Sequence, residues 1–368
     1  MSAAGDRGDL PDDLHDLERA LLAAIGDLAT GPGGPDASDR GELLLGLLDA
    51  QVQSRVIDHA ARWLRTLGHG YYTIGSAGHE SNAAVAAALR PTDPALLHYR
   101  SGGFYCARAR QVPGHDPVRD VLAGMLALAD EPIAGGRHKV FGHPALAIMP
   151  QTSTIASHLP RALGVAFSIG RARRLKGPVR TAWPEDAIAV CSFGDASANH
   201  STAQGAINAA CYTAHGGLAV PLLLVCEDNG WGISVPTPSG WIEASLGGRQ
   251  GLRYVQVDGT DPVGVYEATG ELADYVRTAA RPALLHLRCV RYLGHAGTDV
   301  ESGYRSAGSI RRDYERDPIL ATARQLTVAG VCAPAELVDR YLAARRSVRD
   351  TAIDMVGEPT LRSVDEVV

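Results

Sequence analysis

The stretch that most constrains the fold runs from residue 187 to residue 238. It holds two short apolar runs, 187–193 and 218–226, of a kind typical of strands buried on both faces of a parallel sheet. Gly194 and Asp195 follow the first run, and Asp228, Asn229 and Gly230 follow the second. Because neighbouring parallel strands end at the same edge of a sheet, we expect Asp195 and Asn229 to meet there.

The residues at this edge predict a site for an anion and a cation together. Small and polar residues at 196–202 can open a helix, whose free backbone N–H groups and positive end attract anions. A carboxylate from Asp195, an amide oxygen from Asn229 and nearby carbonyls suit Mg²⁺, which completes its shell with phosphate oxygens and water. Taken singly, each segment would more often be an ordinary helix start or turn. The two segments would far more rarely occur together by chance in this order, each directly after an apolar strand.

Residues 187–238 resemble the diphosphate-binding motif of thiamine diphosphate enzymes, which opens with Gly-Asp-Gly and closes with Asn-Asn. More narrowly, they look like the alpha subunit of the decarboxylating component of 2-oxo acid dehydrogenase complexes, on the branched-chain side. Three departures stand out: Ala196 occupies the second Gly position, Asp228 replaces the first Asn, and Asn229 follows Asp195 by 34 positions, a few more than usual. Ala196 is acceptable if its φ is negative, and we place the extra length in the turn at 214–219.

The remaining sequence predicts an α/β fold: a doubly wound, mostly parallel sheet of the thiamine diphosphate-binding type. Strands are expected at 95–99, 252–257 and 283–290, and helices at 42–67, 80–89, 116–129, 156–175, 261–280 and 319–355, with an active-site loop at 291–318. The run TGPGGPDASDR marks residues 1–40 as a mobile N-terminal segment and linker. Residues 41–356 would form the cofactor-binding domain with its C-terminal helices, and 357–368 a tail.

The resemblance assigns further cofactor contacts. Tyr99 and Arg100 would hold the diphosphate, and a guanidinium offers the bidentate fork that phosphate oxygens accept. Ile155, with Ser153 before it, would lie beneath the cofactor and impose its bent conformation. Gly194, Ala196 and Ser197 would supply backbone N–H groups, and Tyr71 and Tyr72 would lie near the substrate pocket. The simpler alternatives are a surface salt bridge for Arg100 and an ordinary core position for Ile155.

The segment after residue 290 is similar to the active-site loop of the same family. Its residues occur in the family's order: Arg291, Gly294, His295, Asp299, Tyr304 and Arg305. By resemblance His295 contacts the cofactor and assists proton transfer or orients the acyl acceptor, a role suited to a near-neutral pKa. A lone histidine in a glycine-rich loop is otherwise usually just solvated. The phosphorylation seen after this histidine in some members is not expected, because Ala296 stands there.

The resemblance also completes the metal site and implies partners. Mg²⁺ would be held by Asp195, Asn229 and the carbonyl of Trp231. The glutamate that activates the cofactor lies on a second, homologous domain, so we expect a beta subunit in an α₂β₂ assembly. A lipoyl acyltransferase would accept the acyl group, and the substrate would be a small 2-oxo acid. The basic residues Arg137, His138, Lys139 and His143 receive no role.

Composition limits the location and the partners. A net charge of −6 argues against a nucleic-acid partner, and no apolar run is long enough to span a membrane. The start is acidic and polar, without the basic and apolar regions of a signal peptide. The six cysteines form no CxxC pair, and we expect reduced core residues in a cytoplasmic protein.

Two other functions fit the same residues. Ala196, the longer central turn and Ala296 allow an acetoin-dehydrogenase-like or carboligating thiamine diphosphate enzyme of specialised metabolism. A non-catalytic scaffold paralogue is the third possibility, although Asp195, Asn229, Arg100 and His295 are all intact. The first half of a fused two-domain protein would have the same sequence features as a separate alpha subunit.

Overall fold

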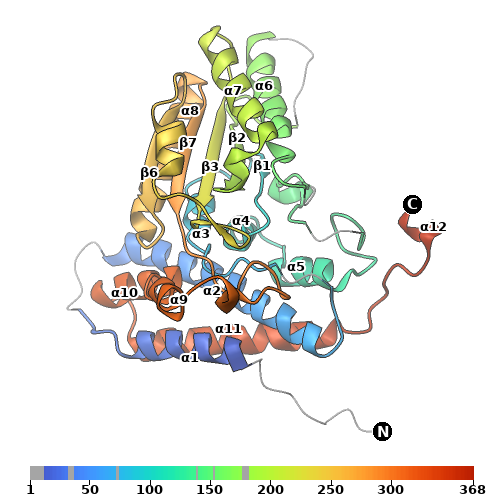
Figure 1. Cartoon of the computed structure of the whole chain (residues 1–368), viewed down its shortest axis with the longest axis vertical. Helices are drawn as coiled ribbons and strands as arrows, with labels where there is room; N and C mark the ends of the chain where they lie inside the picture. Colours follow the sequence, from blue (N-terminus) through green and yellow to red (C-terminus); the bar gives the residue numbers. More distant parts are fainter. Residues whose placement is uncertain (1–11, 32–36, 72–73, 138–139, 152–153, 176–181) are drawn as a thin grey trace.

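A five-stranded parallel sheet forms the centre of the molecule (Figure 1). The computed structural model describes residues 12–31, 37–71, 74–137, 140–151, 154–175 and 182–368. In spatial order the strands are β1 (Ala95–Leu96), β2 (Ala189–Gly194), β3 (Leu222–Asp228), β7 (Ala283–Arg288) and β6 (Arg253–Asp258). Every neighbouring pair is parallel, which confirms the predicted α/β class with a mostly parallel sheet.

Side chains on the strands alternate between two cores. On β3, Leu223 and Val225 pack into one hydrophobic cluster, whereas Leu222 and Leu224 pack into the other. This period of two means that both faces of the sheet are covered. The apolar run predicted from residue 218 enters the sheet only at Leu222, directly after Pro221, which has no N–H group to donate to a ladder.

Helices cover both faces of the sheet. Two of them, α6 (His158–Leu175) and α7 (Ser201–His215), lie on one face, and α8 (Pro262–Ala279) and α3 (Asn82–Ala87) lie on the other (Figure 1). Beyond α3, the helices α2 (Ala37–Thr66), α4 (Gly102–Gln111) and α5 (Pro117–Leu126) extend the larger core. Helix α4 was not predicted, because its mixed residues carry no clear apolar stripe, although eight of its ten residues are buried.

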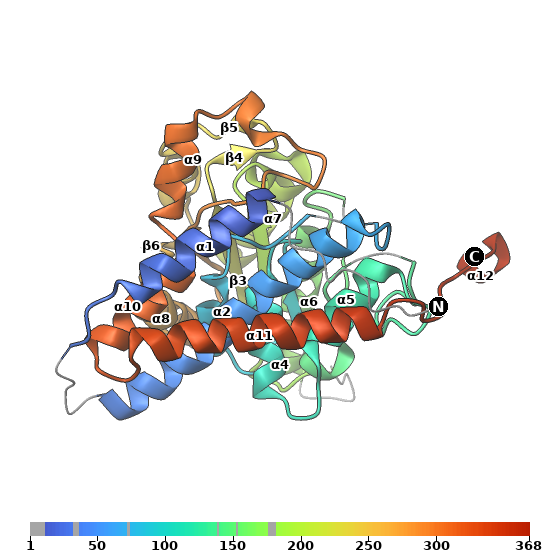
Figure 2. The ribbon, with the colours of Figure 1, turned by 90° about the horizontal axis from the view of Figure 1, so that it is seen from below.

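Within residues 1–40, which we expected to be a mobile segment and linker, the described residues 12–31 pack on the folded body. Residues Asp12–Gly26 form α1, which lies beside α2 and α11 (Pro334–Asp354) in Figure 2. Leu17, Leu21 and Ile25 are buried on its inner face. The surface that α1 covers is assembled from separate parts of the chain: Leu17 clusters with Ala77, Val290 and Tyr292, and α10 (Pro318–Val328) and α11 pack against the helix.

The C-terminal region is more divided than its sequence pattern predicted. The expected helix at 319–355 is two helices, α10 (Pro318–Val328) and α11, separated by a turn in which Gly330 has a φ of 67°. The expected loop contains a short 3-10 turn (Glu301–Gly303) and α9 (Ala307–Tyr314). In the tail, the carbonyl of Pro359 accepts the Ala129 N–H at 2.8 Å before α12 (Val364–Val367).

Two further expectations concern the cysteines and membrane-spanning helices. All six cysteines are buried and unpaired, as predicted. Among the described residues, no helix combines the length and the apolar character needed to cross a membrane.

Candidate functional site

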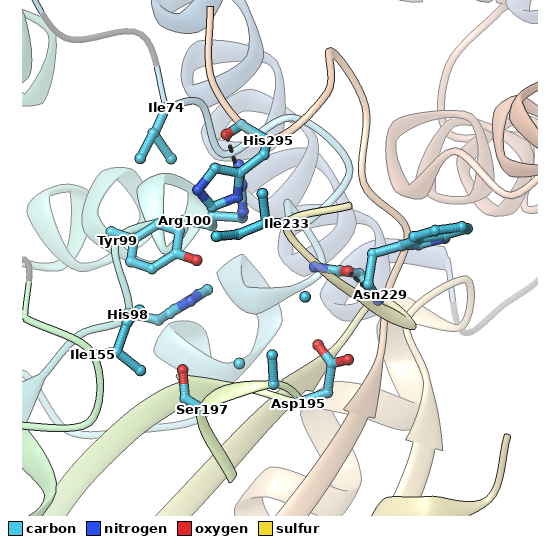
Figure 3. Close-up of a pocket in the computed structure, with 14 residues that line it drawn as sticks. Ile74, His98, Tyr99, Arg100, Ile155, Asp195, Ser197, Asn229, Ile233 and His295 are labelled. Atoms are coloured by element: carbon cyan, nitrogen blue, oxygen red, sulfur yellow. Dashed lines mark hydrogen bonds between the residues drawn. The ribbon is translucent and has the colours of Figure 1, made fainter. Parts of the chain in front are cut away.

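A cavity of about 480 Å³ opens at the carboxyl edge of β2 and β3 (Figure 3). Most of its lining was predicted from the sequence: Tyr99, Arg100, Ile155, Gly194, Asp195, Ala196, Ser197, Asn229, Trp231 and His295. Four lining residues were not predicted: Ile74, His98, Gly232 and Ile233. The residues come from six separate segments of the chain, four of which lie at or after the ends of strands in the parallel sheet.

The two expected cation ligands lie next to each other at this edge. Asp195 follows β2 and is 1% exposed, and its carboxylate accepts a hydrogen bond from the Thr237 hydroxyl. Burial raises the pKa of Asp195 to about 6, because a surrounding of low polarity disfavours the charged carboxylate. Asn229 follows β3, and its side-chain oxygen accepts the Trp231 N–H at 3.0 Å. These oxygens form a donor set that a hard divalent cation prefers.

Asp228, which stands where the family motif has Asn, bonds away from the cation site. One of its carboxylate oxygens lies 2.8 Å from Nε2 of His286, whose Nδ1 lies 2.7 Å from the hydroxyl of Tyr254. The other accepts the Gly230 N–H at 2.9 Å. Asp228 does not line the cavity. The carboxylate therefore anchors the turn to β6 and β7, which explains why Asp is tolerated at this position.

The backbone conformation of Ala196 explains why an alanine can replace the second Gly of the motif. Its φ of −64° and ψ of −37° are open to any L-residue, so the second Gly of the motif is not needed here for its conformation. The opposite wall is tight, because a Cβ atom on Gly232 would lie 2.8 Å from the Ala196 Cβ. A 3-10 turn (Ser197–Asn199) follows, and Ser197 points into the cavity (Figure 3).

Arg100 supplies positive charge on the far side of the cavity. Its side chain is 2% exposed, and its guanidinium donates to the carbonyl of Gly75 at 2.6 Å and to the carbonyl of His295 at 2.9 Å. The guanidinium also lies 5.2 Å from the ring centroid of Tyr99. These contacts hold the guanidinium in one orientation before an anion binds, so less side-chain entropy is lost on binding.

The active-site loop is held by its own motif residues. The hydroxyl of Tyr304 donates to Asp299 at 2.5 Å and accepts from the Arg291 guanidinium at 2.6 Å. Asp299 in turn accepts the His295 N–H at 2.6 Å. The spaced residues of the motif therefore form one hydrogen-bonded network that presents the imidazole of His295 to the cavity (Figure 3).

The expectation of a near-neutral pKa for His295 is wrong in this structure. Burial lowers its pKa to about 4, and the positive charges of Arg100 and Arg291 add to the effect. The imidazole is therefore neutral at pH 7. The sequence placed His295 at the site but could not show how many cations surround it.

Backbone strain is concentrated around the cavity. Of the non-glycine residues with positive φ, Ile233 (58°) lines the cavity, and Ala156 (63°) and Leu293 (65°) lie within two positions of the lining residues Ile155 and His295. The β-branched Ile233 is the most unusual of these, and its carbonyl accepts a hydrogen bond from Arg291 at 2.7 Å. The other three such residues that the structure describes, Ala127, Ala147 and Ala280, cap helices. Strain of this kind is typical of functional sites.

His98 is the most informative lining residue that the sequence reasoning missed. It is 3% exposed, and within the described residues its two ring nitrogens have no hydrogen-bond partner. Its ring centroid lies 4.0 Å from that of Tyr99. Burial and then the neighbouring His79 and Arg100 lower its pKa well below the ordinary value. Its place directly before the Tyr-Arg pair was the available signal.

Several predicted residues are not placed at the cavity. Tyr71 is 80% exposed and does not line it; Ile74, three positions later, does. Of the basic residues to which no role was given, Arg137 donates to the carbonyls of Glu366 and Val367 in the tail, and His143 caps a short 3-10 turn. Tyr72, His138, Lys139 and Ser153 lie outside the described residues.

The lining fits a diphosphate with a divalent cation. Acidic and amide oxygens lie on one wall, a fixed guanidinium on another, and the small residues Gly194, Ala196 and Gly232 leave room for an anion between them. Ile74, Ile155 and Ile233 supply an apolar surface for an organic group.

Comparison with known proteins gives a consistent set of relatives. The profile of the family described as "Dehydrogenase E1 component" matches residues 49–358. The 2-oxoisovalerate dehydrogenase subunit alpha of Bacillus subtilis (strain 168) is 28% identical over 287 residues, which cover 76% of this chain and 80% of that protein. The mitochondrial 2-oxoisovalerate dehydrogenase subunit alpha 2 of Arabidopsis thaliana is 27% identical over 269 residues, or 72% of this chain and 52% of that protein.

A relative outside the 2-oxoisovalerate group shows similar coverage. The mitochondrial pyruvate dehydrogenase E1 component subunit alpha of Sminthopsis macroura is 24% identical over 277 residues, which cover 75% of this chain and 70% of that protein. The match thus spans about half the length of the Arabidopsis relative and most of the other two.

Proposed function

The chain belongs to the dehydrogenase E1 component family, and from this premise we propose that it is the alpha subunit of a thiamine diphosphate-dependent 2-oxo acid dehydrogenase. The proposed enzyme decarboxylates branched-chain 2-oxo acids and transfers the acyl group to a lipoyl acceptor. The observation that carries this proposal is the convergence of Asp195, Asn229 and Arg100 on one cavity. Asp195 and Asn229 were assigned from the two ends of one motif, and Arg100 from a separate segment.

The proposal gives each wall of the cavity a task. Asp195, Asn229 and the carbonyl of Trp231 would hold Mg²⁺. Tyr99, Arg100 and the N–H groups at Ala196 and Ser197 would hold the diphosphate, while Ile155 would support the bent cofactor. When bound, thiamine diphosphate supplies the carbon nucleophile and the electron-accepting ring that decarboxylation requires. The protein contributes orientation and fixed charge.

His295 is the group we assign to the transfer half of the reaction. Its imidazole is neutral and can accept a proton or a hydrogen bond at the mouth of the cavity. His295→Ala should retain decarboxylation with an artificial electron acceptor and lose reductive acylation of a lipoyl domain by ~10²–10⁴-fold. Equal losses of both activities, rescued by excess cofactor, would instead assign His295 to diphosphate binding alone.

A beta-type subunit is part of the proposal. No glutamate lines the cavity in the described part of the chain, so the activating carboxylate would come from a partner in an α₂β₂ assembly. Ile155 and Ile233 at the cavity, and Val235 and Val300 in the neighbouring segments, leave large apolar side chains exposed. Such residues fit a surface that a partner covers.

The substrate class is proposed from the apolar lining and from the relatives. Ile74, Ile155 and Ile233 favour an aliphatic substituent on the 2-oxo acid. The relatives from Bacillus and Arabidopsis carry 2-oxoisovalerate in their names. Comparing the branched 2-oxo acid with pyruvate as substrates of the assembled enzyme tests this choice.

The decisive experiment is cofactor binding by the chain co-expressed with a beta-type subunit. Asp195→Asn should abolish Mg²⁺-dependent binding of thiamine diphosphate in calorimetry. Asp258→Asn is the matched control, because Asp258 ends β6 at the same sheet edge but lies outside the cavity lining. Unchanged binding in Asp195→Asn would overturn the proposed function.

A further inference from the structure

We infer that His79, held by the buried carboxylate of Glu227, orients the side-chain amide of Asn229 so that its oxygen faces the cation site. The inference rests on the proposed function and extends it to two residues that do not line the cavity. His79 and Glu227 are thus positioning residues, which act through Asn229.

The three side chains form a continuous chain of hydrogen bonds. Glu227 lies near the end of β3, and His79 lies in the turn before α3; both are fully buried. Nδ1 of His79 lies 2.8 Å from a carboxylate oxygen of Glu227. Nε2 of the same ring lies 2.9 Å from the amide nitrogen of Asn229. The ring therefore connects the buried carboxylate to the expected metal ligand (Asn229 in Figure 3).

Donor and acceptor rules allow one arrangement of this chain. The Trp231 N–H can only donate, so the group 3.0 Å from it must be the oxygen of Asn229. The NH₂ group of Asn229 then faces His79, and Nε2 of His79 must accept from it. The ring proton is left on Nδ1, where it is donated to Glu227. Both ends of the chain thus require the same amide orientation.

Glu227 is itself fixed as an acceptor. Its carboxylate accepts from the Ser101 hydroxyl at 2.7 Å and from the Asn82 amide at 3.1 Å, in addition to His79. The Asn82 amide is held in turn, because its oxygen accepts the Phe104 N–H at 2.7 Å. The charge is buried but surrounded by donors, which is the condition under which a buried carboxylate is tolerated.

The same cluster is not itself a metal site. Ligand atoms of His79, Glu227 and Cys289 lie within 4.8 Å of one another. The His79 and Glu227 atoms are already engaged in the hydrogen bonds described above. The cluster therefore acts as a rigid support behind the cation site rather than as a second one.

The orientation matters because the two ends of an amide are electrically opposite. The Asn229 oxygen has two lone pairs; one accepts the Trp231 N–H, and the other is available to a cation. A reversed amide would present its NH₂ group to the cation and repel it. Loss of such an outer hydrogen bond typically weakens metal binding by ~10–100-fold.

The test compares variants that differ in the polarity they present to Asn229. His79→Gln can accept from Asn229 and donate to Glu227, whereas His79→Lys can pair with Glu227 but can only donate. His79→Leu removes both bonds. Each variant would be co-expressed with the beta-type subunit, and free Mn²⁺ would be titrated by electron paramagnetic resonance in the presence of pyrophosphate. Thermal unfolding without ligands would check the fold.

We expect the Mn²⁺ dissociation constant to rise ~10–100-fold in His79→Lys and His79→Leu and much less in His79→Gln. If His79→Leu does not fold, the comparison of His79→Gln with His79→Lys still tests the positioning role. Equal weakening in those two, or wild-type affinity in His79→Lys, would overturn the positioning role. Absence of pyrophosphate-dependent Mn²⁺ binding in the wild type would instead overturn the proposed function itself.

Discussion

The guanidinium of Arg100 lies 2.9 Å from the carbonyl oxygen of His295 and 3.2 Å from Nδ1 of the same residue. Arg100 lies in the turn between β1 and α4, and His295 lies in the loop after β7, 195 positions later. The pair therefore closes one side of the cavity and couples the expected diphosphate-binding residue to the expected acid–base residue. We therefore expect a substitution at either residue to alter the position and the hydrogen bonds of the other.

Arg100→Lys should weaken thiamine diphosphate binding. A lysine ammonium cannot reach the carbonyls of Gly75 and His295 and also present a planar fork to an anion. Losing one charge-assisted hydrogen bond of ~1.5–3 kcal/mol corresponds to ~10–100-fold in the dissociation constant. Calorimetry on the assembled enzyme would measure it. The control is Arg90→Lys, an exposed arginine paired with Asp186, and equal affinities for the two variants would contradict the role of Arg100.

The depressed pKa of His295 predicts how stability depends on pH. The pKa is lowered from 6.5 to about 4 in the folded protein, so between these values the unfolded chain binds a proton that the folded chain does not. Protonation of His295 therefore does not lower the free energy of unfolding above about pH 6.5, and lowers it progressively as the pH falls towards about 4. His295→Gln removes the titrating group.

The difference in thermal midpoint between wild type and His295→Gln isolates this effect, because other buried histidines are present in both proteins. The midpoint of the wild type, relative to the variant, should drop as the pH is lowered from about 7 to about 5. A difference that stays constant over this range would show that His295 has an ordinary pKa in the folded protein.

The contact between Ala196 and Gly232 predicts a compensating pair of substitutions. Gly232→Ala should weaken cofactor binding, because the new Cβ would lie 2.8 Å from the Cβ of Ala196 and must push the two turns apart. Overpacking of this kind costs ~1–3 kcal/mol. Ala196→Gly removes the opposing atom, so the double variant should recover most of the affinity, whereas Ala196→Gly alone should bind normally. Failure of the double variant to recover would show that the turns do not meet as described.

Much of this site could be predicted because the strand-end motifs are local. Asp195 and Asn229 each follow an apolar run, and parallel strands that pair in register deliver them to one edge. His295 lies in the loop that follows β7, which ends at Arg288 on the same edge of the sheet. In each case a short pattern and one rule about sheet topology were sufficient.

The missed residues depend on packing between distant segments. His79 and Glu227 are 148 positions apart, and no local pattern connects them. Ile233 reaches the cavity through a left-handed backbone that is unusual for a β-branched residue. The pKa of His295 is lowered first by burial and then by Arg100 and Arg291, and both effects are set by how distant segments pack.

The packing of α1 predicts that truncating one of its buried side chains destabilises the protein. Leu21 is 5% exposed and belongs to the main hydrophobic cluster, although the sequence pattern led us to expect a mobile segment there. Leu21→Ala should lower the free energy of unfolding by ~2–4 kcal/mol, because it removes buried methyl groups and leaves a cavity. Urea unfolding followed by circular dichroism would measure the loss. Ala20→Ser on the exposed side of the same helix is the control and should stay within ~0.5 kcal/mol of wild type. If Leu21→Ala unfolds at the same urea concentration as wild type, α1 does not contribute to the core, and the expected boundary near residue 40 would be restored.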